Sequence, residues 1–167
     1  MLNFFNKNFF TNFFFILFIF SLDRFSKSYV ISQNEKNLSA DLFTSKFLNI
    51  SLIWNEGIAF GLLSFDESYF YNFLTILIII IIIVIFFMIL KSEGLKKYSF
   101  LMVLGGALGN LYDRIFFKAV PDFIDFHIGN FHWFIFNVSD IFISLGVLFL
   151  ITLELINSKK DKIDEKN

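Results

Sequence analysis

The chain has 167 residues, the length of a single domain, and its formal net charge is −1. Hydrophobic residues make up 56% of it, including 28 Phe, well above the fraction in soluble domains, so lipid is its expected solvent. The near-zero charge gives no basis for binding nucleic acid, and the absence of cysteine excludes disulfides, thiolate catalysis and cysteine-ligated metals.

The first apolar segment covers residues 9–22 and follows Lys7. It lacks the small-residue cleavage site of a secretory signal peptide, so we predict an uncleaved transmembrane helix. As a helix these residues rise only about 21 Å, whereas a span needs roughly 20 residues. The helix therefore extends either back to Phe4 or on through Tyr29, and we place the first span at about 9–29.

Extension through Tyr29 places Asp23 and Lys27 four residues apart on one face of this helix. Two roles fit the pair. One is an ion pair that contributes about 0.3–0.5 kcal/mol. The other is the support of a functional site, because a carboxylate near a helix C-terminus opposes the helix dipole and needs a partner.

Residues 31–70 are polar enough to lie outside the membrane. The alternation of apolar and polar residues in 47–54 predicts a strand, the residues from Asn55 to Gly57 are a turn signal, and 58–63 is a candidate returning strand. Two strands alone are only marginally stable. We therefore expect a small sheet supported by the membrane surface or by the helices beneath it.

Three further segments have the length and composition of membrane spans. Residues 71–90 hold an Ile-rich run without any group that can do chemistry, so packing and anchoring are its expected roles. Residues 98–117 contain Gly105 and Gly109 in the small-xxx-small spacing of closely packed membrane helices, and packing is their favoured role. The fourth span is predicted over 138–156, before a charged tail.

The basic residues set the expected orientation of this single membrane domain, 1–167. Lys and Arg are concentrated near the N-terminus, after the second span and in the tail, and are scarce in 31–70 and 116–136. By the positive-inside rule both termini are cytoplasmic. The predicted fold is therefore an all-α membrane protein with four transmembrane helices, a small extracytoplasmic β-sheet at 31–70 and a periplasmic loop at 116–136.

Polar side chains are expected to converge on the outer side of this bundle. They are Asn55, Asn110, Asp113, Arg114, Asp122, Asn137 and Asp140. Carboxylates at membrane depth are functional candidates by default. Two carboxylates held close together share one proton, so that one activates water while the other donates a hydrogen bond to a carbonyl.

Taken singly, these aspartates also have ordinary roles. Asp140 fits a first-turn helix carboxylate beside Asn137, and Asp122 fits a turn residue after Pro121. If the two form a pair, the helix dipole favours ionised Asp140, and Asp122, in a loop before apolar Phe123, is expected to hold the proton. Spacing alone does not select the reacting pair.

The two histidines, His127 and His132, lie five residues apart in a predicted short loop. Two imidazoles can ligate a metal, but the pair lacks a helical i, i+4 spacing. Interfacial packing is therefore the expected role, and no metal site is predicted. No cofactor is expected either, because carboxylates and water suffice for hydrolysis.

Five short motifs occur in order: Asp23-x-x-x-Lys27, Asn55-x-Gly57-x-Ala59-Phe60, Gly105-Gly-Ala-x-Gly-Asn110-x-x-Asp113-Arg114, Val120-Pro-Asp122-Phe and Phe136-Asn137-Val-Ser-Asp140. Together they span most of the chain and resemble the signal peptidase II family, the lipoprotein signal peptidases, which are four-helix aspartyl proteases of the bacterial inner membrane. The resemblance implies that Asp122 and Asp140 are the catalytic pair.

The same resemblance assigns further roles. It implies a substrate site lined by Asn55, Asn110, Arg114 and Asn137. It implies structural or electrostatic support from Asp23, Lys27, Gly57 and Asp113. Two positions depart from the family pattern, Pro121 where an apolar non-proline is usual and Ser139 where Ala is usual. These departures bear on fine positioning rather than on the reaction.

The implied substrate is a prolipoprotein whose cysteine already carries diacylglycerol, cut just before that cysteine by an enzyme that acts as a monomer in the bilayer. The main alternative is a small membrane transporter or channel that uses the same carboxylates. Against it, the second span offers no polar group near mid-membrane. A third interpretation is a non-catalytic scaffold in which the aspartates only cap and pair.

Overall fold

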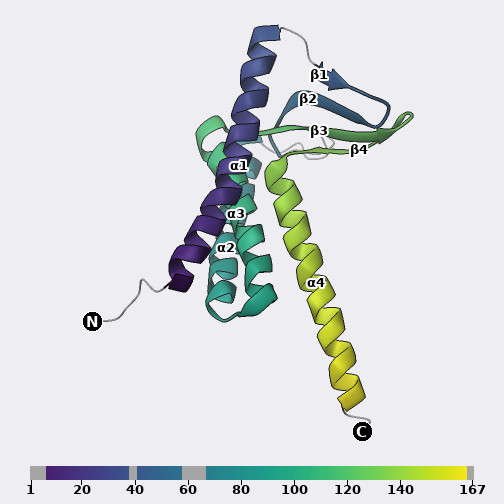
Figure 1. The fold of residues 1–167 in the computed structure, drawn as a ribbon. Helices are drawn as coiled ribbons and strands as arrows, with labels where there is room; N and C mark the ends of the chain where they lie inside the picture. The colour runs from purple at the N-terminus through teal and green to yellow at the C-terminus, as the bar shows by residue number, and fades with distance from the viewer. Residues whose placement is uncertain (1–6, 38–40, 58–66, 165–167) are drawn as a thin grey trace.

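The computed structural model describes residues 7–37, 41–57 and 67–164, and Figure 1 shows their arrangement. Four long helices stand side by side, and a small sheet lies at one end of them. The helices are α1 (Lys7–Asn37), α2 (Glu67–Leu90), α3 (Gly94–Phe117) and α4 (Val138–Asp164). The strands are β1 (Asp41–Thr44), β2 (Leu48–Asn55), β3 (Val120–Ile128) and β4 (Phe131–Phe136).

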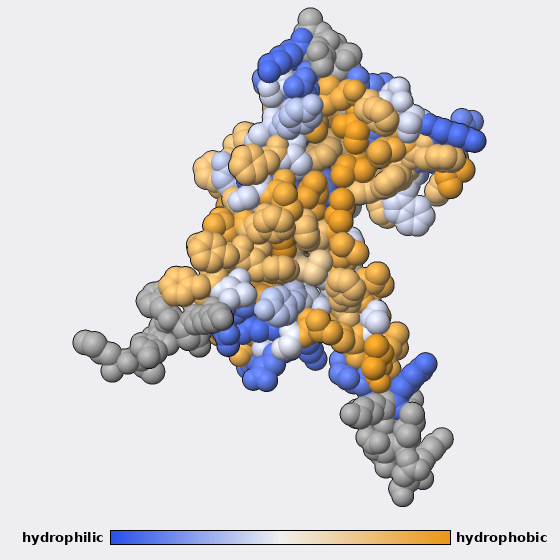
Figure 2. Space-filling model, viewed as in Figure 1, coloured by the Kyte–Doolittle hydropathy of each residue, from blue (hydrophilic) through white to orange (hydrophobic). Residues whose placement is uncertain are grey.

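All four predicted membrane spans are present as helices. Within the described ranges, four helices are long and apolar enough to cross a membrane, at Asn8–Lys36, Tyr71–Leu90, Gly94–Phe117 and Val138–Lys159. In the view of Figure 2, an apolar band crosses the middle of the molecule and hydrophilic residues gather toward both ends. Large side chains such as Phe73, Ile80 and Phe87 of α2 are exposed, as expected for a surface that faces lipid rather than water.

Helix α3 is the centre of the bundle, because it packs against α1, α2 and α4. Its buried residues Phe100, Leu101, Val103 and Leu104 form a core with Ile85 and Ile89 of α2. Three of its glycines, Gly105, Gly106 and Gly109, allow the close approach. A Cβ at Gly105 would lie 3.0 Å from Ile19 of α1, and one at Gly106 would lie 2.5 Å from the Ser139 carbonyl oxygen of α4.

Gly109 makes the tightest of these approaches, since a Cβ there would collide with Ser139 Oγ and lie 2.7 Å from Asp23 Oδ2. The predicted packing role of Gly105 and Gly109 is therefore confirmed. In membrane bundles small residues at the helix interface let backbones approach closely. Here Gly105 and Gly109 bring α1 and α4 against α3 at the level of Asp23 and Ser139.

The four strands form one antiparallel sheet in the order β1-β2-β3-β4. The predicted strand at 47–54 is confirmed as β2. Its predicted returning partner at 58–63 lies outside the described residues. The partners of β2 are instead β1, which precedes it, and β3, which comes from the region predicted as a periplasmic loop. That region is a β-hairpin, β3–β4.

Two site assignments are corrected by this hairpin. Asp122 was expected in a loop, but it lies within β3 and pairs with Ile53 of β2. His127 and His132 were expected in a loop too, but they face each other across β3 and β4. Residues 120–123 are all buried, so they lack the alternation by which a half-exposed strand is recognised.

The helix boundaries also differ from the predicted spans. Helix α1 continues past Tyr29 to Asn37, so its last turns rise beside the sheet (Figure 1). A helix of 31 residues is about 46 Å long, which exceeds the hydrocarbon thickness. Helix α3 begins at Gly94 rather than at Tyr98, and α4 runs to Asp164 rather than to Ile156.

Candidate active site

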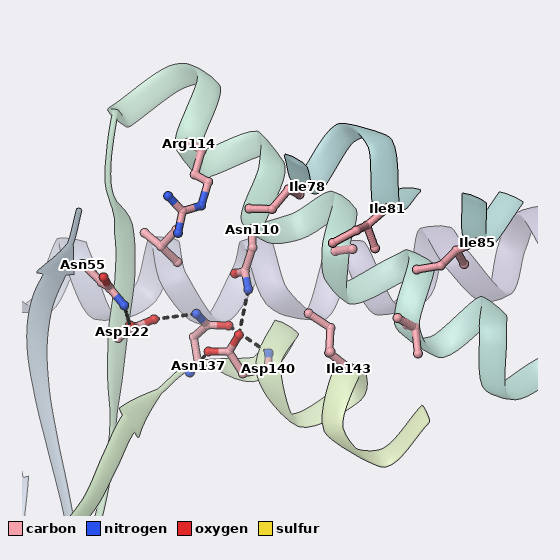
Figure 3. Close-up of a pocket in the computed structure, with 13 residues that line it drawn as sticks. Asn55, Ile78, Ile81, Ile85, Asn110, Arg114, Asp122, Asn137, Asp140 and Ile143 are labelled. Carbon is pink, nitrogen blue, oxygen red and sulfur yellow. Dashed lines mark hydrogen bonds between the residues drawn. The ribbon is translucent and has the colours of Figure 1, made fainter. Parts of the chain in front are cut away.

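The carboxylates of Asp122 and Asp140 are joined by one residue, Asn137, through its side-chain amide and its backbone N–H (Figure 3). Asp122 lies on β3, and Asp140 lies in the first turn of α4. Asn137 Nδ2 donates to Asp122 Oδ1 at 2.6 Å, and the Asn137 backbone N–H donates to Asp140 Oδ2 at 3.1 Å. The two acids that the sequence placed on one membrane face therefore both accept hydrogen bonds from one buried residue, Asn137.

Local sequence holds Asp140 in place. Asn137 precedes the first residue of α4, and its Oδ1 accepts the backbone N–H of Asp140 at 3.1 Å. Together with the bond from the Asn137 N–H to Asp140 Oδ2, this is a reciprocal capping box, in which the cap residue and the third helical residue satisfy each other's backbone donors. The capping role considered for Asp140 is thus confirmed, and these two hydrogen bonds fix the orientation of its carboxylate.

Asp122 is held by two side-chain amides. Its side chain is buried, and Asn55 Nδ2 at the end of β2 donates to its Oδ2 at 2.9 Å. Burial raises the pKa of Asp122 to about 6, and the charge of Asp140 acts in the same direction, while the bonds from Asn55 and Asn137 oppose the rise. Asp122 therefore keeps its proton to a higher pH than a solvent-exposed carboxyl, up to about pH 6.

Asn110 of α3 connects the pair to a buried group of charges. Its Nδ2 donates to Asp140 Oδ1 at 2.7 Å, and its Oδ1 accepts from Lys27 Nζ at 2.9 Å. Lys27 is 1% exposed and contacts Asp23 at 2.9 Å and Asp113 at 2.7 Å. The predicted i, i+4 pair of Asp23 and Lys27 therefore exists.

Asp23 also reaches α4 directly. Its Oδ1 accepts the backbone N–H of Ser139 at 3.0 Å, one residue before Asp140. Of the two roles considered for the pair of Asp23 and Lys27, ion pairing is seen. The pair also contacts the start of α4 and, through Asn110, the Asp140 carboxylate, and its support of the site stays a prediction.

Arg24 completes the charge group and was missed by sequence reasoning. Its guanidinium bonds both oxygens of Asp113 and also Asp23 Oδ2 at 2.7 Å, and it stacks 4.7 Å from the Tyr112 ring. The i, i+4 rule paired Asp23 with Lys27 alone. Its partner Asp113 lies 89 residues away in the sequence, so only the packing of α1 on α3 reveals that contact.

A cavity of about 240 Å³ opens beside the carboxylates. Its polar end holds the two acids and the amides of Asn55, Asn110 and Asn137. Its other end is apolar and lies between α2, α3 and α4 (Figure 3). The lining side chains there are Ile78, Ile81, Ile85, Val103, Ala107 and Ile143.

Arg114 lines the polar end of this cavity, and its Nη1 is buried without a hydrogen-bond partner among the described residues. Tyr71 O–H donates to the Arg114 carbonyl oxygen at 2.7 Å. Gly57 has φ +85°, and a Cβ on it would lie 3.0 Å from Arg114 Nη1. Gly57 thus leaves room for a cationic donor that is free to bind an additional group in the cavity.

A second cavity, of about 560 Å³, meets the same acids from the other side. It shares Asn55, Asp122 and Asp140 with the first cavity, and its walls come from β4 and the start of α4. These walls include Trp133, Phe134, Phe136, Ile141 and Leu145. The carboxylates therefore lie where two largely apolar cavities meet, a suitable position for acting on an extended chain with apolar groups on both sides.

The sequence-predicted site residues thus fall into two connected groups. Asn55, Asn110, Arg114, Asp122, Asn137 and Asp140 line the first cavity. Asp23, Lys27 and Asp113 lie behind it, and the side chain of Asp113 faces α1 rather than the cavity. Pro121 pairs with Trp54 inside the sheet, and Ser139 is fully buried against Gly109.

In the described part of the chain, no group of three metal-ligating side chains includes Asp122 or Asp140. Among the described residues, the group of three side chains suited to hold a metal ion is Asp125, His127 and His132, farther along the β3–β4 hairpin. With two carboxylates, amide donors and space for water, the site itself is able to perform acid–base hydrolysis of a carbonyl compound without a cofactor.

Comparison with known proteins identifies close similarities along most of the chain. A family model described as signal peptidase (SPase) II matches residues 15–156. The chain is 53% identical over 145 residues to the lipoprotein signal peptidase of Pelagibacter ubique (strain HTCC1062), covering 87% of each chain. It is 36% identical to that of Anaplasma phagocytophilum (strain HZ), covering 81% of this chain and 85% of the relative.

Solved structures agree with these sequence matches. A bacterial membrane enzyme determined by the in meso method at 2.3 Å resolution superposes with a TM-score of 0.73 at 29% identity, covering 90% of each chain. A second such structure at 1.9 Å resolution superposes with a TM-score of 0.72 at 30% identity, covering 87% of this chain and 92% of the other.

Proposed function

This chain belongs to the signal peptidase II family, and we propose that it removes signal peptides from diacylglyceryl-modified prolipoproteins with Asp122 and Asp140 as its catalytic pair. It is an aspartic-type endopeptidase and a multi-pass protein of the bacterial inner membrane. The observation that carries the catalytic assignment is the position of the two acids, bridged by Asn137 where two cavities meet.

In the proposed reaction Asp140 is the base. Its ionised form is favoured by the N-terminus of α4 and by the donors of Asn137 and Asn110. It removes a proton from water, which attacks the scissile carbonyl carbon. Asp122 begins protonated and donates a hydrogen bond to the carbonyl oxygen as negative charge develops there. The acids then return protons to the departing amine.

The cavities suggest how the substrate binds. An extended peptide crosses the acids, and its apolar groups enter the two cavities. Arg114 Nη1, which has no hydrogen-bond partner among the described residues, donates to a backbone carbonyl or a lipid ester oxygen. Asn55 also contacts the substrate, in addition to holding Asp122. Asn110 and Asn137 act mainly by positioning the acids, since their amides already bond them.

The test is cleavage of one precursor in two forms. Purified protein in detergent or liposomes is given a prolipoprotein with, or without, the diacylglyceryl group on its cysteine. We expect cleavage just before the cysteine of the lipid-modified form, and a rate at least about 100-fold lower for the unmodified form, because apolar burial of acyl chains contributes about 0.8 kcal/mol per CH₂. Equal cleavage of both forms would refute the lipid requirement.

The transporter interpretation is not favoured. In the described part of the chain, the polar residues of the first cavity lie at its sheet end, and its other lining residues are apolar. A pathway for ions needs polar or ionisable groups farther into the membrane. The same liposomes serve as a check, because ion or solute movement by the protein without cleavage would support that interpretation.

We further propose that both termini are cytoplasmic and that the acids face the periplasm. The short connection between α2 and α3 and the end of α4 lie at the opposite end of the bundle from the sheet (Figure 1). Lys91, Lys96, Lys97, Lys159 and Lys160 belong to that end, as the positive-inside rule requires of a cytoplasmic face.

Topology is testable because the chain contains no cysteine. Asn130→Cys places a single thiol in the turn of the β3–β4 hairpin, and Lys96→Cys places one near the start of α3. In spheroplasts, a membrane-impermeant maleimide is expected to label Asn130→Cys, and to label Lys96→Cys only after lysis. The reverse pattern would overturn the proposed orientation.

A further inference from the structure

The outer part of the β3–β4 hairpin carries a cluster of Asp125, His127 and His132 that the peptidase reaction does not use. Asp125 and His127 are two residues apart on β3, so they share one face of the strand. His132 of β4 pairs with His127, and the two imidazoles stack with ring centroids 4.9 Å apart. All three side chains therefore lie together.

A β-bulge brings His132 to this face. Between the pairs Asp125–Ile135 and His127–His132, β3 advances by two residues while β4 advances by three. Without the extra residue in β4, the alternation of the strand would turn His132 to the opposite face. Bulges are known to re-aim side chains in this way, and here the result is two imidazoles beside one carboxylate.

The donor atoms of the cluster are close enough to share an ion. One ligand atom from each residue lies within 4.8 Å of the others, and His132 Nδ1 is 2.8 Å from Asp125 Oδ2. The buried Nδ1 of His127 has no hydrogen-bond partner among the described residues. Asp125 is held at 5% exposure, whereas the His132 side chain is 50% exposed, which gives an ion an entry path.

We propose that Asp125, His127 and His132 form a binding site for a divalent transition-metal ion of the Zn²⁺ class, with water as the fourth ligand. Imidazole nitrogen and carboxylate oxygen are preferred ligands of such ions. Tetrahedral Zn²⁺ places its ligand atoms about 3.3 Å apart, so the donor atoms need to approach one another by up to about 1.5 Å. The stacked imidazoles also need to rotate so that both ring planes contain the ion. The bound ion joins β3 to β4 and thereby fixes the outer end of the hairpin.

The low expectation of a metal here came from the spacing of the histidines, which suits no helix. On a hairpin with a short turn, residues five apart become direct neighbours across the strands. The proposed site is also separate from the catalytic acids. Asp122 and Asp125 are three residues apart on β3, so alternation places their side chains on opposite faces of the sheet.

The experiment is a calorimetric titration, in which Zn²⁺ is added to tag-free protein in detergent and the heat of binding is measured. We expect one ion per chain for the wild type, and affinity at least about tenfold weaker for His132→Gln and for His127→Gln. His132 is half-exposed, so that variant is expected to fold. Zn²⁺ is also expected to raise the melting temperature of the wild type and not that of His132→Gln, because an ion that binds the folded state stabilises it.

Two carboxylate variants serve as matched controls. Asp140→Asn alters the catalytic pair and Asp41→Asn removes an exposed acid from β1 of the same sheet, and both are expected to bind Zn²⁺ as the wild type does. Equal Zn²⁺ affinity in wild type and His132→Gln would overturn the proposal, and so would loss of binding in Asp140→Asn. Because the measurement is of binding alone, its outcome is independent of the proposed peptidase reaction.

Discussion

Replacement of Asp122 or Asp140 by asparagine is expected to lower kcat/KM for a lipid-modified precursor by about 10³-fold or more, since each acid moves a proton in the proposed reaction. Asparagine keeps the size of the side chain but neither accepts a proton from water nor donates one to the amine. The double variant is expected to be scarcely slower than either single one, because residues that act as a unit are not additive.

Asp41→Asn is the matched control for these variants, since it makes the same chemical change at an exposed position of β1. Thermal unfolding of each variant separates loss of catalysis from loss of fold. Cleavage at the wild-type rate by Asp122→Asn, with the fold intact, would remove that residue from the catalytic pair, and the same holds for Asp140→Asn.

The pH profile tests which acid holds the proton. Burial raises the pKa of Asp122 to about 6, so the protonated form that donates to the substrate carbonyl decreases as the pH rises above that value. We expect kcat/KM, which reports the free enzyme, to fall at higher pH with a midpoint near 6. Asn55→Leu removes a bond that lowers this pKa, so its midpoint is expected at higher pH. A profile unchanged by Asn55→Leu would contradict this assignment.

The largest effect on stability is expected from Asp113→Asn, which is predicted to lower the free energy of unfolding by about 3–5 kcal/mol. Asp113 is fully buried and accepts hydrogen bonds from Lys27 Nζ and from the Arg24 guanidinium. Loss of its charge leaves the two cations with Asp23 alone. An incompletely paired buried charge is costly because its hydration is lost without full compensation.

The ion pair of Lys96 and Glu154 provides the comparison for Asp113. Its atoms are 3.7 Å apart, and its side chains are 49% and 74% exposed. Glu154→Gln is therefore expected to change the unfolding free energy by less than about 1 kcal/mol. Equal destabilisation by Asp113→Asn and Glu154→Gln, measured by denaturation in the same detergent, would show that the buried group contributes no more than a surface pair.

The spans and the convergence of the site were predictable because they depend on composition and topology. The Ile-rich run of 71–90 has the length and composition of a membrane-spanning helix. The distribution of Lys and Arg indicated that Asp122, Asn137 and Asp140 lie at the same end of the bundle. Turn-like Asn137 ahead of an apolar run also indicated the start of α4, where the structure has it.

The pairings within the site were not predictable from spacing. Asp122 follows Pro121, which suggested a turn, and residues 120–123 of its strand are all buried, which removes the alternating pattern there. The contacts of Arg24 and Lys27 with Asp113 join residues more than 80 positions apart. They depend on how α1 rotates against α3, and the glycines of α3 indicate close packing without giving that rotation.

The charge group shared by α1 and α3 has a consequence for the biogenesis of this protein. Helix α1 emerges first, carrying Asp23, Arg24 and Lys27, with one more positive than negative charge. Asp113, the group that restores neutrality, is synthesised 89 residues after Arg24. Ionised side chains are poorly tolerated in hydrocarbon, so we expect this part of α1 to stay in contact with water or the translocon until α3 arrives, and docking of the two helices to complete insertion of the first.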